Sequence, residues 1–153
     1  MADRPASTER TVQVFARAAA PVDDVWVWLA DASSWSSWTM LTRSELEQKG
    51  EPEPDGVGAI RRFGRPGGTS REQVIEFDPP HHLAYTILSG MPVRSYRADV
   101  DLSVDGDGTL VSWRARFQPK TALLGWPLQR FFTFVLGRFA RALAGQAAKR
   151  PLP

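Results

Sequence analysis

The strongest structural constraint in this sequence is a pair of alternating segments joined by a tight turn. Residues 94–104 and 109–117 place apolar side chains at every second position, and Asp-Gly-Asp-Gly at 105–108 joins them. A period of two with a glycine-rich connection predicts an antiparallel hairpin with one apolar and one solvated face. The alternation directs Tyr96, Val100 and Trp113 inward, and Asp101, Arg114 and Arg116 toward water. Such a face must be buried against another layer.

The last third of the chain supplies that layer, because the hydrophobic period there becomes helical. Apolar residues recur at three- and four-residue spacing between positions 128 and 143, which predicts a helix over Pro127–Lys149. At 1.5 Å per residue this helix is about 33 Å long. Arg130 and Arg138 interrupt its apolar stretch, so we expect a helix packed on protein and no membrane span.

The remaining chain predicts one strand, two short helices and four further strands. Residues 11–18 alternate and form the first strand. A helix follows, with Asp23 and Asp24 at the positive end of its dipole, and a second short helix runs through Trp35 and Trp38. We expect the other strands at 41–49, 57–65, 69–77 and 82–89, separated by turn-rich segments at 51–56, 66–68 and 78–80.

This order of elements predicts an α+β fold. A seven-stranded antiparallel sheet has an apolar face too large to cover itself, so the sheet must curve around the long C-terminal helix. One helix cannot fill a curved sheet completely, and a cavity is expected between them. We expect a single ligand-binding domain over 11–150, preceded by a flexible tail over 1–10.

Composition narrows the functional classes. The absence of cysteine excludes disulfides and thiolate zinc sites, and fits a reducing compartment. The first residues contain no apolar segment typical of a secretory signal, so we expect a cytoplasmic protein. The net charge is only +2 and the arginines are scattered among acids, which argues against a nucleic-acid partner.

Several segments together resemble the START-like superfamily, also called SRPBCC, in its polyketide cyclase/dehydrase-like branch. They read APVDDVWVWLAD with SSWSSW, GVGAIRRF, EFDPPHHLAYTILSGMPVRSYRADVDL and DGDGTLVSWRARF, within residues 11–149. The resemblance implies the helix-grip fold, with a hydrophobic tunnel between sheet and C-terminal helix. It also implies binding of lipids, sterols, hormones or polyketides, and some members cyclise or dehydrate polyketide chains. The family therefore implies a pocket without fixing a reaction.

Polar side chains in the wall of such a tunnel are candidate ligand contacts, because burying them costs several kcal/mol unless they are paired. Arg62 and Glu72 flank the Pro-Gly-Gly turn, and form either a cross-strand ion pair or part of the site. Tyr85 and Tyr96 lie on successive predicted strands and present hydroxyls to a ligand or to solvent.

Aromatic and apolar side chains complete the candidate site. Trp35 and Trp38 belong to the short helix that lies near the cavity mouth in the resembling fold, and act either as core residues or as a gate or stacking surface for the ligand. Trp113 lies on an apolar strand face and is first of all a core residue. The predicted ligand-binding set also contains Ala98, Phe131 and Val135.

No metal or cofactor site is predicted. His81 and His82 are the only histidines, and adjacent residues in an extended loop point in opposite directions, so they are interpreted as turn residues. The sequence contains no glycine-rich phosphate loop and no nucleophile elbow.

Three functional hypotheses follow. The leading one is a carrier or sensor, monomeric or homodimeric, that binds a small hydrophobic molecule such as a lipid or polyketide. The second is a polyketide cyclase or dehydratase, in which Tyr85, Tyr96, Arg62 or Glu72 supplies acid–base groups. The third is an interaction module with a nearly closed cavity. A ligand retained during purification favours the first, and turnover of a ketide thioester favours the second.

Overall fold

The computed structural model describes residues 8–149, so most of the predicted N-terminal tail lies outside the described residues. Seven antiparallel strands form one sheet in the order β1-β7-β6-β5-β4-β3-β2. The strands are β1 (Arg10–Ala18), β2 (Arg43–Gln48), β3 (Ile60–Arg65), β4 (Gly68–Asp78), β5 (His82–Ser89), β6 (Val93–Asp105) and β7 (Gly108–Pro119). The helices are α1 (Val22–Ala30), α2 (Trp35–Trp38) and α3 (Gly125–Lys149), with single 3-10 turns at Ala32–Ser34 and Ala122–Leu124.

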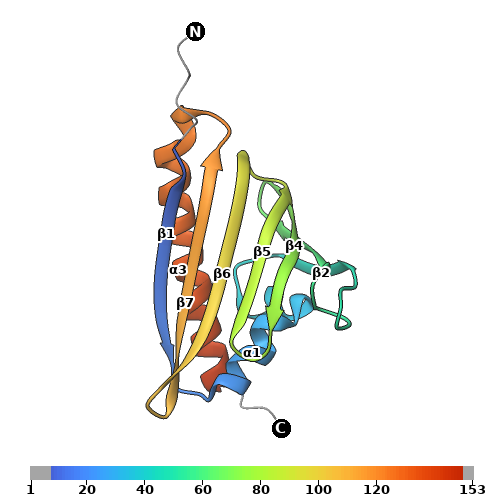
Figure 1. Ribbon diagram of the computed structural model, residues 1–153, viewed down its shortest axis with the longest axis vertical. Helices are drawn as coiled ribbons and strands as arrows, with labels where there is room; N and C mark the ends of the chain where they lie inside the picture. Colours follow the sequence, from blue (N-terminus) through green and yellow to red (C-terminus); the bar gives the residue numbers. More distant parts are fainter. Residues whose placement is uncertain (1–7, 150–153) are drawn as a thin grey trace.

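This arrangement confirms the predicted α+β, helix-grip architecture. Figure 1 shows α3 behind β1 and β7, while β5, β4 and β2 lie farther from it and α1 lies near the lower end of β5. Among the described residues, no helix is long and apolar enough to cross a membrane.

The β6–β7 hairpin has the register that the alternation predicts. Val100 lies opposite Trp113, and both are fully buried. Arg114 and Arg116, between the buried residues of β7, are exposed as expected. The connection turns at Gly106, whose φ of 61° lies in the left-handed region that glycine adopts without steric strain.

Helix α3 covers the sheet unevenly. Its buried face packs mainly along β1 and β7 and reaches α1, and consists of Leu128, Phe132, Leu136, Phe139 and Leu143 with small residues between them. The helix begins at Gly125, two residues earlier than predicted, which leaves Pro127 in its first turn. Strands β3, β4 and β5 have few contacts with α3, and the space between them and the helix is where a cavity forms.

Strands β2 and β3 are shorter than the sequence predicts. Strand β2 covers Arg43–Gln48, and β3 begins only at Ile60, because most of the connection over 50–59 folds back on itself. The backbone N–H of Glu51 donates to the carbonyl of Val57, and that of Gly50 donates to the carbonyl of Pro54. These bonds pair the loop with itself up to Val57, and only Gly58 and Ala59, at its end, exchange backbone hydrogen bonds with Val74 of β4.

Candidate functional site

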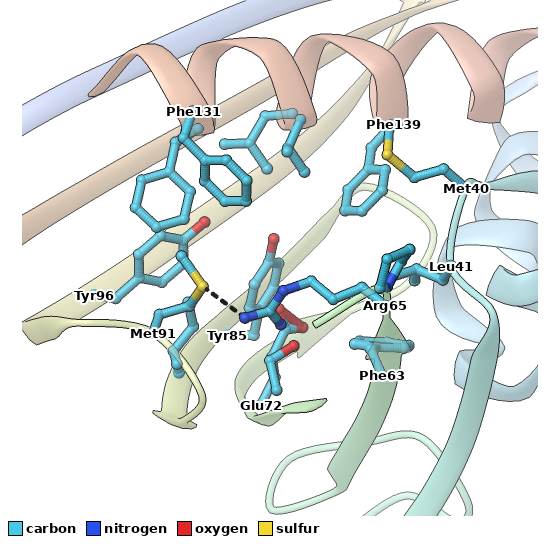
Figure 2. Close-up of a pocket in the computed structure, with 16 residues that line it drawn as sticks. Met40, Leu41, Phe63, Arg65, Glu72, Tyr85, Met91, Tyr96, Phe131 and Phe139 are labelled. Carbon is cyan, nitrogen blue, oxygen red and sulfur yellow. Dashed lines mark hydrogen bonds between the residues drawn. The ribbon is translucent and has the colours of Figure 1, made fainter. Parts of the chain in front are cut away.

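A cavity of about 310 Å³ lies between the curved half of the sheet and α3. Its wall is almost entirely apolar, and Figure 2 shows side chains from the sheet and from α3 facing each other across it. The lining residues are Met40, Leu41, Phe63, Arg65, Pro66, Ser70, Glu72, Tyr85, Ile87, Met91, Tyr96, Phe131, Phe132, Val135, Leu136 and Phe139. A mostly apolar, concave site with a few polar groups is typical of small-molecule binding.

Two tyrosine hydroxyls provide polar groups in this wall. Tyr85 on β5 is fixed by the indole of Trp113, whose Nε1 donates a hydrogen bond of 3.1 Å to the Tyr85 hydroxyl oxygen. Tyr96 on β6 lies beside it, with ring centroids 6.1 Å apart, and packs against Phe132 of α3. Burial raises the pKa of both tyrosines above the ordinary value of 10, so both hydroxyls remain protonated at neutral pH.

An ion pair is buried in the same wall. Strand β3 turns Arg61 inward opposite Glu72 of β4, and an Arg61 Nη2 lies 3.0 Å from a Glu72 carboxylate oxygen. The guanidinium carbon lies 4.7 Å from the ring centroids of both Trp35 and Tyr85, so the cation is enclosed by aromatic faces. Glu72 lines the cavity, whereas Arg61 lies behind it.

The environment of this pair is strongly desolvated. Burial raises the pKa of the Glu72 carboxyl, and the charge and hydrogen bond of Arg61 oppose that shift only in part. The Nε and Nη1 groups of Arg61 are buried and have no hydrogen-bond partner among the described residues. The site therefore combines a carboxyl group with a raised pKa, a buried cation and two hydroxyls in an apolar setting.

The cavity mouth lies between two turns and the helix. Arg65, at the end of β3, donates from Nη2 to the carbonyl of Gly90 at 2.7 Å and contacts the sulfur of Met91 at 3.3 Å (Figure 2). This contact ties the β3–β4 turn to the β5–β6 turn. Met40 and Phe131 complete the rim, 42% and 39% exposed.

Half of the predicted ligand-binding set lines the cavity: Glu72, Tyr85, Tyr96, Phe131 and Val135. Trp35, Trp113 and Ala98 lie elsewhere in the core, each with no exposed surface. Trp35 stacks on Phe63, and Trp113 supports Tyr85 from behind. These two tryptophans hold cavity-lining residues in place from behind, and do not line the cavity themselves.

Two further residues of the predicted ligand-binding set lie outside the cavity. Trp38 lines a separate surface hollow with Arg138 and Phe139, and its Nε1 donates to the Ser34 hydroxyl at 3.0 Å. Arg62 is exposed on the outer face of β3, so the prediction that it pairs with Glu72 is wrong. Arg61, one residue earlier, takes that place.

The sequence did not single out Arg61, because the adjacent Arg62 carries the same charge and was assigned as the partner of Glu72. The signal that identifies it is the alternation of β3, in which Arg61 and Phe63 share the buried face. The methionines at the rim, Met40 and Met91, were also missed, because they lie in turns with no periodicity.

A second charged cluster lies on the outer face of the sheet. Glu76, His82 and Asp99 place ligand-type atoms within 4.8 Å of one another. Arg97 already bridges both carboxylates, at 3.0 Å from Glu76 and 2.9 Å from Asp99. Both ring nitrogens of His82 are also engaged, each 2.7 Å from a carboxylate oxygen of Glu76 or Asp101. We interpret this cluster as an ion-pair network, and His82, predicted as a turn residue, begins β5.

The curved sheet, the long helix and the cavity between them define a helix-grip protein. The family model described as "Polyketide cyclase / dehydrase and lipid transport" matches residues 9–150. The chain therefore belongs to this family. No curated protein sequence matches the chain significantly.

Solved structures with the same fold are distant in sequence. A START superfamily protein from Mycobacterium smegmatis superimposes with a TM-score of 0.77 at 14% identity, covering 91% of this chain and 97% of that one. Norcoclaurine synthase from Thalictrum flavum, in complex with dopamine and hydroxybenzaldehyde, gives 0.77 at 16% identity, with coverages of 97% and 91%. An aromatase/cyclase from Streptomyces sp. R1128 gives 0.73 at 21% identity, with coverages of 94% and 96%. At these identities the likeness shows the fold alone.

Proposed function

We propose that this protein binds a small hydrophobic molecule, of the lipid or aromatic polyketide type, in the cavity between the sheet and α3. The observation that carries the proposal is the apolar cavity of about 310 Å³, enclosed by sixteen side chains of which most are apolar. Burying apolar ligand surface there contributes about 25 cal/mol per Å² before the costs of association. The absence of cysteine supports a cytoplasmic location for this role.

The polar groups define the ligand more closely. The Tyr85 and Tyr96 hydroxyls and the Glu72 carboxyl lie in a wall whose other polar residues are Arg65 and Ser70. A ligand with one or two carbonyl or hydroxyl oxygens matches them, because protonated hydroxyls donate hydrogen bonds to such oxygens. A purely hydrocarbon ligand offers the tyrosine hydroxyls no acceptor, and a buried donor without an acceptor costs about 1–3 kcal/mol.

A cavity-filling variant tests the proposal. Val135 lines the cavity, so Val135→Trp is expected to weaken binding of a fluorescent fatty-acid or naphthyl probe at least tenfold. The matched control is Phe134→Trp, because Phe134 is the neighbouring residue but points away from the cavity and is 58% exposed. Ala98→Phe is unsuitable, because Ala98 has no exposed surface and a larger side chain there overpacks the core. Equal probe affinity in wild type and Val135→Trp, or no binding by wild type, contradicts the proposal.

A specific observation also favours acid–base catalysis as a second candidate. Glu72 lines the cavity with a raised pKa, beside two protonated tyrosine hydroxyls. Cyclisation and dehydration of a poly-ketone require a group that accepts and returns a proton, and a raised pKa makes a carboxyl better suited to that role. Two of the solved neighbours are named as a synthase and an aromatase/cyclase, which supports an enzymatic role by fold analogy.

Turnover of a model ketide thioester distinguishes the two candidates. The enzyme hypothesis expects product formation that Tyr96→Phe slows by a factor of ten or more without loss of probe affinity. Tyr96→Phe is suitable because it keeps the ring that packs against Phe132 and removes only the hydroxyl. Probe binding without turnover favours the carrier or sensor.

A further inference from the structure

The face of α3 that points away from the sheet carries large apolar side chains. Trp126 is 64% exposed and Phe134 is 58% exposed, and Leu123, in the turn before the helix, is 89% exposed. These three residues contribute nothing to the core, and Trp126 is the most exposed of the six tryptophans. An apolar patch of this kind on a surface helix marks an interaction site.

Arginines are interleaved with the aromatic residues on this face. Trp126, Arg130, Phe134 and Arg138 are spaced by four residues, so they lie along one side of the helix. The Arg130 guanidinium lies 5.3 Å from the Trp126 ring centroid, and that of Arg138 lies 5.7 Å from Phe134. None of these arginines has an ion-pair partner among the described residues. We call Leu123 and these four residues the outer face of α3.

The charge of the surrounding sequence is strongly asymmetric. After Asp107 the chain contains eight lysines and arginines and no acidic residue, whereas residues 1–107 contain 11 basic and 17 acidic residues. Helix α3 itself carries Arg130, Arg138, Arg141 and Lys149 without a single acid. The small net charge of the whole protein therefore conceals a basic C-terminal segment, whose electrostatic complement is an anionic surface.

The outer face of α3 borders the cavity mouth. Phe131, on the neighbouring side of the helix, is 39% exposed and also lines the cavity. Arg138 shares a surface hollow with Met40, the other exposed residue of the rim. A surface that covers the outer face of α3 therefore also lies next to the route into the cavity.

We propose that the outer face of α3 docks on an anionic lipid surface. Tryptophan and phenylalanine insert into the headgroup boundary of a bilayer, while arginines beside them pair with lipid phosphates. The attraction of basic residues to such a surface falls off with ionic strength. The alternation of aromatic and basic residues on one helix face matches this chemistry, and the docking goes beyond the pocket function without depending on it.

Vesicle co-sedimentation tests the proposal. Wild-type protein is expected to bind phosphatidylcholine vesicles that contain about one third phosphatidylglycerol, and to bind pure phosphatidylcholine at least tenfold more weakly. Arg130→Glu/Arg138→Glu is expected to lower binding to the anionic vesicles at least tenfold. The control is Arg62→Glu/Arg116→Glu, which makes the same change in net charge on the outer face of the sheet, where both residues are exposed. Equal loss in both double variants overturns the proposal, as does the absence of binding by wild type.

Fluorescence and oligomeric state complete the test. Trp126 emission is expected to shift to shorter wavelength on the anionic vesicles, and Trp126→Phe is expected to abolish that shift. A wild-type dimer in solution that Arg130→Glu/Arg138→Glu converts to a monomer shows that a second copy covers this face, and overturns the proposal. The cavity probe, measured without vesicles, separates the two functions: vesicle binding without probe binding refutes only the pocket function.

Discussion

The sheet carries a charged cluster on each of its two faces, and the two clusters are built in opposite ways. On the outer face, Arg97 and His82 distribute their hydrogen bonds over several carboxylates, of which Glu76 and Asp101 are in contact with solvent. On the inner face, Arg61 has one partner, Glu72, and two of its donor groups have no partner among the described residues. In the outer cluster the charged groups have hydrogen-bond partners on neighbouring strands, which supports strand pairing. The inner pair, Arg61 and Glu72, forms a polar centre in an apolar wall.

The largest expected effect follows from removing one member of the inner pair. Glu72→Gln leaves the Arg61 cation buried without its counter-charge, and is expected to lower the free energy of unfolding by about 3 kcal/mol. Glu76→Gln, in the outer network, is expected to cost less than about 1 kcal/mol, because that side chain is half exposed. Urea denaturation of both variants measures the difference. Similar losses of stability in the two variants would contradict the distinction between a desolvated inner pair and a solvated outer network.

Removing both members of the inner pair sharpens the comparison. Arg61→Met/Glu72→Met replaces two desolvated charges with apolar volume, and is expected to recover about 2 kcal/mol relative to Glu72→Gln. The same variant removes the polar centre from the cavity wall. A double variant less stable than Glu72→Gln would indicate that the pair stabilises the fold, and that its role is not mainly functional.

A smaller effect is expected from a neutral hydrogen bond on each face of β7. Tyr85→Phe removes the acceptor of the buried Trp113 Nε1, and is expected to cost about 1–2 kcal/mol. Ser112→Ala removes the exposed contact of 3.3 Å with Gln13, and is expected to change stability by less than about 0.5 kcal/mol. Thermal unfolding checks the order of the two, and a reversed order would contradict the inner–outer distinction.

The smallest expected effect is the pH dependence of the outer network. Burial lowers the pKa of His82, but the hydrogen bonds to Glu76 and Asp101 outweigh it and raise the pKa above its ordinary value of 6.5. A raised folded-state pKa means that the stabilisation is fully present below about pH 6.5 and is lost as the pH rises through the folded-state pKa. The stability difference between wild type and His82→Gln should therefore shrink from pH 6 to pH 9, by about 1 kcal/mol or less. A difference that grows with pH would contradict this assignment.

The hairpin and the long helix could be predicted from sequence, because local periodicity determines both. Val100 and Trp113 share the buried face as their alternation indicates. The family assignment was also available, because several separate segments carry the resemblance in the right order.

The polar centre could not be predicted in detail, because it depends on strand register. A turn of three residues over 66–68 pairs Arg62 with Glu72. The structure instead pairs Arg65 with Gly68, and Gly67 adopts a φ of 92° in a turn of two residues. Shortening the turn by one residue shifts the pairing partner of Glu72 to Arg61. Neighbouring arginines conceal such a shift, since both registers place a cation opposite the same acid.

The uneven coverage of the sheet by α3 has a consequence for the rate of ligand exchange. The helix is packed along β1 and β7, whereas β3, β4 and β5 face the cavity and their pairing is interrupted by register shifts at Arg71/Glu72 and Val74/Glu76. Amide hydrogens of β7 are therefore expected to exchange with deuterium only through global unfolding, and those of β3 and β4 through local opening. The lifetime of a molecule bound in the cavity is then expected to depend on local opening of β3 and β4, while β1 and β7 stay packed on α3.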